Sequence, residues 1–201
     1  MGVAGLLLGL LTGWIMGSQH GTPQRAAAPS QQAAAPSGQQ ATPPALDQNR
    51  VAQLTAEADK APRNAAPRAQ LGNLYFDSER FDEAIRWYQA ALEIDPRQVD
   101  VSTDLGIAYY YANQPDRALA QFEQSLAIDP RHSKTLLNIG VVRAWGKQDL
   151  EGAAKAWERV IEVAPASEEA ARAKQGLEGI RAAHPDAGRG AAPVKPQGPS
   201  D

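Results

Sequence analysis

Residues 71–96 read LGNLYFDSERFDEAIRWYQAALEIDP, and residues 105–130 repeat that pattern as LGIAYYYANQPDRALAQFEQSLAIDP. Residues 139–165 repeat it again as IGVVRAWGKQDLEGAAKAWERVIEVAP. A Leu-Gly or Ile-Gly pair opens each copy, a proline closes it, and the first two copies are 34 residues apart (Gly72 to Gly106). The third copy has one additional residue between Gly140 and Ala153. A repeat at a fixed period predicts a structural unit that stacks on its neighbours.

Each copy predicts two helices joined by a turn. In the first copy, Leu71 and Tyr75, and then Ala84, Tyr88 and Ala91, recur at steps of three or four residues, which gives each helix an apolar stripe. The closing proline ends the second helix, because it biases the residue before it away from helical geometry. A glycine inside a helix costs about 1 kcal/mol relative to alanine, so a glycine that recurs indicates close packing. We expect each glycine to meet the small alanine of the following helix: Gly72 with Ala84, Gly106 with Ala118, and Gly140 with Ala153.

The period and the order of these residues resemble the tetratricopeptide repeat, a helix–turn–helix unit that stacks into a solenoid. The resemblance implies an all-α solenoid over residues 46–184. Residues 46–60 resemble the second helix of a preceding repeat, and residues 167–184 are expected to form a capping helix over the last exposed face. The prediction is eight helices, six of them in three repeats: 65–98, 99–132 and 133–166. An ordinary helical bundle with an accidental similarity is the alternative.

The N-terminal segment has a different composition. Residues 1–18 are apolar and have no charged side chain. As a helix they would span about 27 Å, slightly less than the roughly 30 Å hydrocarbon core of a bilayer. We favour an uncleaved single-pass membrane anchor over a cleaved signal peptide, because no Lys or Arg precedes the apolar run and no small-residue cleavage site ends it. Glycines at steps of four predict a face that packs against another membrane helix, from a second copy or a partner: Gly5, Gly9, Gly13 and Gly17.

Two further segments resemble each other in composition. Residues 19–45 consist mainly of Ala, Pro, Gln, Ser and Gly, and residues 185–201 have the same character. Such segments bury too little apolar area to offset chain entropy, so we expect a disordered tether before the repeats and a loose tail after them. No motif was expected in either segment.

Composition excludes several function classes. The chain has 20 basic and 23 acidic residues, a net charge of −3, which gives no reason to expect a nucleic-acid partner. It has no cysteine, which excludes disulfides, zinc–cysteine sites and thiol catalysis. Its three histidines are scattered, and it has no glycine-rich phosphate loop or metal-ligand spacing. We therefore expect no catalytic residues, no metal and no cofactor.

The tetratricopeptide resemblance also implies where a partner binds. In such domains the first helix of each repeat lines a concave groove that holds an extended peptide or a partner's helix. The aromatic residues Phe76, Tyr110, Tyr111 and Trp145 fall at groove positions that the repeat's own core does not require, and aromatic residues dominate binding hot spots. The implied groove residues are Ala69, Asn73, Phe76, Thr103, Ile107, Tyr110, Tyr111, Leu137, Asn138, Val141 and Trp145.

One subclass of these domains, the chaperone-binding adaptors, holds a C-terminal carboxylate with five polar groove residues. The matching positions here are Ala69, Asn73, Asp104, Lys134 and Asn138. Only Asn73 and Lys134 fit that pattern, and Asp104 would repel a carboxylate. A mainly apolar, aromatic groove favours a hydrophobic peptide or helix instead.

The sequence thus predicts a membrane-anchored bacterial scaffold or adaptor that binds another protein. By analogy with accessory proteins of bacterial envelope assembly, including cytochrome c maturation factors, we expect the repeats on the periplasmic side. A structural role in which the anchor oligomerises the protein is the first alternative. A subunit that supplies substrate to a catalytic partner is the second.

Overall fold

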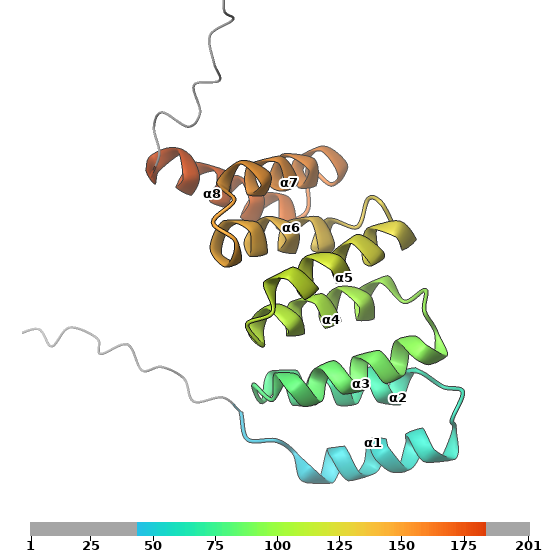
Figure 1. The fold of residues 1–201 in the computed structure, drawn as a ribbon. Helices are drawn as coiled ribbons and strands as arrows, with labels where there is room; N and C mark the ends of the chain where they lie inside the picture. Colours follow the sequence, from blue (N-terminus) through green and yellow to red (C-terminus); the bar gives the residue numbers. More distant parts are fainter. Residues whose placement is uncertain (1–43, 184–201) are drawn as a thin grey trace, which may run out of the picture. The chain divides into compact units, whose positions relative to one another are not determined.

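The computed structural model describes residues 44–183. These residues form eight α-helices and one short π-helix, and they contain no strand (Figure 1). The predicted all-helical array of eight helices is confirmed. The helices are α1 Gln48–Lys60, α2 Ala66–Asp77, α3 Phe81–Ile94, α4 Val99–Tyr111, α5 Pro115–Ile128, α6 Ser133–Val141, η1 Val142–Gly146, α7 Leu150–Val163 and α8 Glu168–Ala183.

Several predictions concern segments outside the described residues. These segments are the anchor at residues 1–18 with its four glycines, the linker up to residue 43, and the tail from residue 185. None of the helices between residues 44 and 183 is long and apolar enough to cross a membrane.

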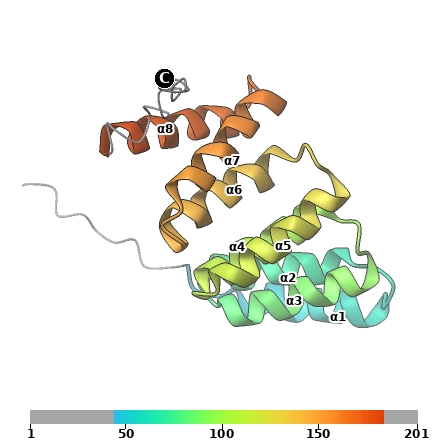
Figure 2. The same ribbon diagram turned by 45° about the horizontal axis from the view of Figure 1, so that its top comes forward.

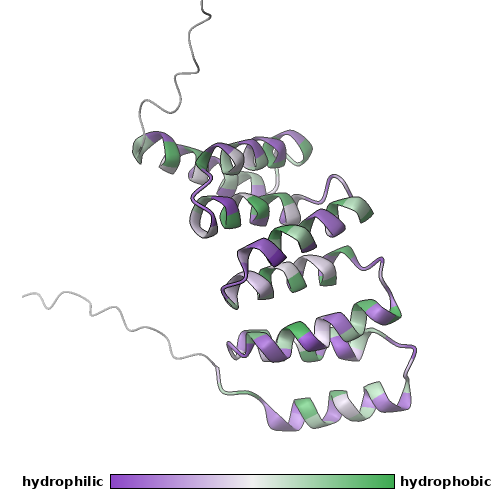
Figure 3. Ribbon diagram, in the orientation of Figure 1, coloured by the Kyte–Doolittle hydropathy of each residue, from purple (hydrophilic) through white to green (hydrophobic). Residues whose placement is uncertain are grey.

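The helices stack in antiparallel pairs that follow the order of the chain (Figures 1 and 2). Helix α2 packs on α3, α4 on α5, and α6 on α7, while α8 packs on both α6 and α7. Figure 3 shows hydrophobic and hydrophilic residues mixed along the helices, and the second helices of the repeats bury an apolar face, as α3 does with Ala84, Tyr88 and Ala91. Helix α1 packs on α2 and buries Leu54 and Ala58 there.

Short polar side chains cap the N-termini of three helices, α1, α7 and α8. The Asp47 carboxylate accepts a hydrogen bond from Arg50 N at 3.0 Å, and Asp149 accepts one from Gly152 N at 2.8 Å. Ser167 Oγ accepts one from Ala170 N at 3.1 Å. Each contact satisfies a backbone donor that has no partner within its own helix.

The repeated glycines pack against aromatic rings, a contact that the predicted glycine–alanine approach does not include. A Cβ atom added to Gly72 would lie within 3.0 Å of ring atoms of Tyr88, and Gly106 has the same relation to Phe122. Gly140 meets Trp157 in the same way. The ring atoms fill the space that a side chain would occupy, so the aromatic residue explains the glycine. Alanine was expected because close backbone approach is the commoner reason for a helical glycine.

The additional residue of the third repeat is accommodated within a helix. In the second repeat Ala112 N donates to the carbonyl of Ala108, four positions earlier. The equivalent Lys147 N donates to the carbonyl of Val142, five positions earlier, at 3.0 Å. This wider turn is the π-helix Val142–Gly146 that continues α6. An insertion of one residue into an α-helix commonly takes this form, often beside a functional site.

In each repeat, the turn between the two helices contains one residue whose backbone is in the left-handed region of φ and ψ. Glu79, Asn113 and Gln148 have φ values of 56°, 59° and 56°. Glu79 and Asn113 are 34 positions apart, while Asn113 and Gln148 are 35 apart, because the additional residue of the third repeat precedes Gln148. The three turns are therefore equivalent, and the irregularity is confined to η1.

The apolar core divides into two clusters. One consists of residues from the first two repeats, including Tyr88, Tyr109 and Phe122, and extends to Val142. The other joins α6, α7 and α8 around Trp157, which is 2% exposed and donates from Nε1 to the Leu137 carbonyl at 3.1 Å. The third repeat and the capping helix thus share a core of their own.

Candidate functional site

A pocket of about 860 Å³ lies between the third repeat and the capping helix. Helices α4 and α6 and the π-helix η1 form one side of it, and α8 forms the other. Its lining is mostly apolar, with a few polar and charged groups, as in typical binding sites for small molecules and side chains. The lining residues are Ile107, Tyr111, Lys134, Leu137, Asn138, Val141, Ala144, Trp145, Leu150, Trp157, Glu169, Arg172, Gln175, Gly176, Gly179, Ile180 and Ala183.

Six of the predicted groove residues line this pocket together: Ile107, Tyr111, Leu137, Asn138, Val141 and Trp145. They come from the second and third repeats. The predicted residues of the first repeat, Ala69, Asn73 and Phe76, do not line it. Ala69 and Phe76 pack against the first core cluster, and Asn73 Oδ1 accepts a 2.8 Å hydrogen bond from the Tyr88 hydroxyl. The structure therefore gathers the site at one end of the predicted groove.

Tyr111 and Trp145 are the two large hydrophobic side chains that the described region leaves exposed, at 58% and 64%. Tyr111 ends α4, and Trp145 lies in η1. The additional residue of the third repeat falls within this same turn, so the π-helix determines where the Trp145 side chain lies. An exposed aromatic pair on one pocket wall is a strong candidate for a binding hot spot.

Three further aromatic rings, two of them from the first repeat, pack against Tyr111. Its ring centroid is 5.5 Å from that of Phe76 and 5.3 Å from that of Phe81, at the start of α3. Tyr110 is 5.7 Å away in an edge-to-face arrangement and lines a second hollow of about 350 Å³, next to Trp145 and Pro115. Phe76, predicted as a groove residue, thus acts mainly by packing against Tyr111.

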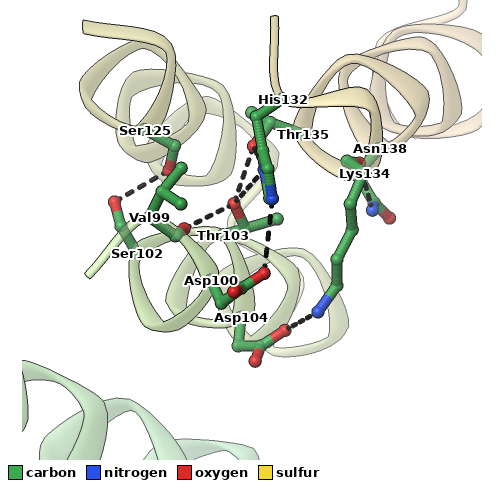
Figure 4. Close-up of polar contacts among 10 residues, drawn as sticks. All are labelled: Val99, Asp100, Ser102, Thr103, Asp104, Ser125, His132, Lys134, Thr135 and Asn138. Atoms are coloured by element: carbon green, nitrogen blue, oxygen red, sulfur yellow. Dashed lines mark hydrogen bonds and ion pairs between the residues drawn. The ribbon is translucent and has the colours of Figure 1, made fainter. Parts of the chain in front are cut away.

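Thr103 was predicted to line the groove, and the structure corrects this. Its side chain is fully buried, donates to the Val99 carbonyl at 2.8 Å, and lies 2.7 Å from Thr135 Oγ1 on α6 (Figure 4). His132 Nδ1 lies 2.7 Å from the same Thr135 oxygen, and its Nε2 is 3.3 Å from Asp100. These polar contacts form the junction between the second and third repeats, which lies between the two apolar clusters.

The positions that would bind a C-terminal carboxylate are occupied by contacts within the chain. Lys134 Nζ lies 2.6 Å from Asp104 Oδ1, so its charge is already paired (Figure 4). Asn138 Nδ2 donates to the Lys134 carbonyl at 2.8 Å, and Asn73 accepts from Tyr88. Burial, together with the charges of Asp104 and Asp77, raises the pKa of Tyr88, so its hydroxyl remains a donor.

The charged groups of the pocket belong mainly to α8. Arg172 forms an ion pair with Glu168 at 2.6 Å. Hydrogen bonds from its own backbone N–H and from Ser167 lower the pKa of Glu169, so that carboxyl stays negative. Between residues 44 and 183 the structure has no group of three His, Cys, Asp or Glu side chains able to hold a metal ion.

The α8 wall of the pocket was missed by the sequence analysis, as were Leu150 and Trp157. Helix α8 was interpreted only as a cap, although it takes the place of the first helix of a fourth repeat. The signal was the spacing: Leu137, Val141 and Trp145 advance by 35 residues to Arg172, Gly176 and Ile180, all of which line the pocket.

Comparison with known proteins agrees with this fold. Two family models match the chain, one described as a TPR repeat over residues 72–112 and one as a tetratricopeptide repeat over residues 103–171. No curated protein matches it.

Several solved structures are similar. MamA has 18% identity and a TM-score of 0.60, with 67% of this chain and 77% of MamA covered. The first TPR of Spaghetti (RPAP3), bound to the HSP90 peptide SRMEEVD, has 29% identity and a TM-score of 0.54, with 60% and 92% covered. The Sgt2 TPR domain from Aspergillus fumigatus has 28% identity and a TM-score of 0.55, with 68% and 88% covered. Residues 72–171 of this chain are therefore tetratricopeptide repeats, within an all-helical solenoid of that kind.

Proposed function

We propose that this protein is an interaction scaffold that binds an extended peptide or a helix of a partner protein in the pocket between η1 and α8. The observation that carries the proposal is the exposure of Tyr111 and Trp145 on the wall of that pocket. Burying two exposed aromatic rings against a partner would remove a large apolar area from water, and such rings lose little rotamer freedom.

The chemistry of the pocket favours an apolar anchor on the partner. The structure of the Spaghetti domain holds a peptide with acidic residues near its C-terminus, SRMEEVD. Here Asp104 pairs with Lys134 at 2.6 Å, so a partner's carboxylate would have to compete with Asp104 for that cation. We therefore expect the partner to insert hydrophobic side chains, with its charges outside the pocket.

Membrane attachment forms the second part of the proposal. The uncharged apolar residues 1–18 support a single-pass anchor, and residues 19–45 would serve as the tether to the repeats. A bacterial protein whose repeats face the periplasm would then present its pocket to partners near the membrane surface. No enzymatic step is part of this function.

The decisive experiment is crosslinking in native membranes, followed by identification of the captured proteins. The double variant Tyr111→Ala, Trp145→Ala should lose the main captured partner while it keeps the helical circular dichroism of the wild type. The control variant Glu123→Ala, Gln124→Ala changes two exposed residues of α5 and should capture the partner normally. Unchanged capture by a folded double variant would refute the pocket as the binding site.

A second function is favoured by one observation, the step of four between Gly5, Gly9, Gly13 and Gly17. Glycines at this spacing allow two membrane helices to approach closely, so the anchor itself would drive oligomerisation. Replacing Gly9 and Gly13 by Ile should then dissociate the oligomer in membranes. An unchanged oligomeric state and unchanged partner recovery would exclude this function.

A further inference from the structure

Tyr110, Tyr111 and Trp145 form one surface, which we call the aromatic patch. Tyr111 and Trp145 line both the main pocket and the smaller hollow, and Tyr110 lines the hollow. Tyr88 and Trp157 use their polar atoms in hydrogen bonds within the described region. The patch combines exposed ring faces with hydroxyl and indole donors at its edges, which suits a ligand with free carbonyl groups.

The chain itself contains a segment of the complementary kind. Pro193, Pro196 and Pro199 recur every third residue. A polyproline II helix has three residues per turn and no internal hydrogen bonds, so these prolines would share one edge and leave their carbonyls free. Aromatic-lined grooves bind such segments because the segment loses little entropy on binding. The prolines before α1, at positions 23, 29, 36, 43 and 44, do not recur at every third residue, so they do not form such an edge.

The place where α8 ends brings this segment to the patch. Ala183, the last residue of α8, lines the same pocket as Tyr111 and Trp145. Pro193 lies ten positions after Ala183, and an extended chain over ten steps reaches about 33 Å. The N-terminal segment instead joins the array at α1, which contributes no residue to the pocket.

The charges of the segment also fit the pocket. Residues 193–199 contain Lys195 and no acidic residue, while Arg189, Asp186 and Asp201 lie outside this segment. Of the charged side chains that line the pocket, Lys134 and Arg172 are paired with carboxylates of the chain. Glu169, which also interacts with Arg172, is the pocket carboxylate that can attract Lys195.

We propose that residues 193–199 dock on the aromatic patch of their own chain as a polyproline II segment and compete there with the protein partner. This proposal rests on the proposed function, because it assigns a regulator to the same surface. Tethering gives the segment a high local concentration, so even a weak contact is occupied until a tighter partner displaces it.

The sequence has no cysteine, so in a disulfide-trapping test only the two introduced cysteines can form a disulfide. Gln197→Cys in the full chain is combined either with Val141→Cys, inside the pocket, or with Glu178→Cys, on the exposed side of α8 and nearer to the tail along the chain. Under mild oxidation at high dilution, the Val141 pair should form its intramolecular disulfide about tenfold faster, because docking raises the local concentration of the tail.

Two further variants of the Val141 pair identify the contact. Adding Tyr111→Ala and Trp145→Ala, or replacing the three prolines by Ala, should lower its rate to that of the Glu178 pair. Equal rates for the two pairs, or a rate that is unaffected by loss of the rings, would overturn the proposal. A disulfide between two chains would also overturn it, in favour of a second copy as the occupant.

Partner capture separates this proposal from the proposed function. The triple variant Pro193→Ala, Pro196→Ala, Pro199→Ala should capture more of the partner than the wild type does. If the trapping test fails while Tyr111→Ala, Trp145→Ala still abolishes capture, only the docking of the tail is wrong.

Discussion

The first two repeats and the third are built on one plan but differ in how the first helix of each ends. The first two repeats have regular turns and share one apolar cluster. The third has the π-helix η1, an exposed Trp145, and a separate cluster with α7 and α8. The first repeat thus contributes no residue to the candidate pocket, while the second repeat, the irregular third repeat and the cap line it together. Specificity in a repeat protein is expected where one copy departs from the others.

The largest effect should come from removing the central ring of either cluster. Trp157→Ala should lower the free energy of unfolding by roughly 3 to 5 kcal/mol, and Phe122→Ala should cost a similar amount, since both rings are buried. Hydrogen exchange distinguishes them, because Trp157→Ala should deprotect mainly α6–α8 and Phe122→Ala mainly α2–α5. Equal loss of protection throughout would show that the two clusters unfold as one unit.

A smaller effect should separate glycines that meet a ring from a glycine that does not. Gly106→Ala places a methyl group against the Phe122 ring and should cost about 1 to 3 kcal/mol, less a gain of up to about 1 kcal/mol in helix propensity. Gly179 has nothing within 4 Å of an added Cβ, so Gly179→Ala should stabilise α8 slightly. Urea denaturation measures both, and destabilisation by Gly179→Ala would contradict this explanation.

The polar junction between the two clusters can be tested with a double-mutant cycle. Thr103→Val or Thr135→Val alone should cost about 1 to 2 kcal/mol, because each removes one contact of the remaining buried hydroxyl, which keeps the Val99 carbonyl or His132 Nδ1. The double variant should cost less than the sum of the two, since both hydroxyls are then removed together. Additive costs would mean that the 2.7 Å contact contributes little.

Deleting Gly146 should restore a 34-residue period and convert η1 to an ordinary helix end. We expect the free energy of unfolding to change by no more than about 1 kcal/mol, because the deletion makes the third turn match the first two. Partner capture should nevertheless fall, since the Trp145 side chain is repositioned. Normal capture by the deletion variant would show that the π-helix has no part in binding.

The smallest effect should come from the left-handed turn residues. Glu79→Gly and Gln148→Gly should each stabilise the protein by about 0.5 to 1 kcal/mol, because a side chain is disfavoured at their positive φ. Asn113→Gly should gain less, since asparagine tolerates this conformation. Thermal unfolding of the three variants compares the equivalent turns directly.

The helical array could be predicted because the period of 34, the apolar stripes and the closing prolines all describe local features that repeat. The additional residue in the third copy was also visible, but its π-helical form was not. A single insertion can lengthen a loop or widen a helix, and which of the two occurs depends on tertiary packing that the local sequence does not show.

The candidate site was less predictable, for two physical reasons. Thr103 occupies a groove position in the repeat, but its side chain bonds to Thr135, 32 residues away, and no local pattern reveals such a pair. The residues of α8 follow the repeat spacing, but the helix lacks the Leu-Gly and proline residues that mark a full copy. The pocket of the structure therefore shares six residues with the predicted groove and adds the α8 wall, while the first-repeat positions remain a prediction.

Three of the four tryptophans lie in the described region, each in a different environment. Trp157 is buried in the second cluster, Trp145 is on the pocket wall, and Trp87 is partly buried on α3. The molecule therefore carries its own fluorescent reporters. Emission from Trp157 would follow the loss of the second cluster, and quenching of Trp145 would follow occupation of the pocket. Single replacements by phenylalanine would assign each signal without any external label.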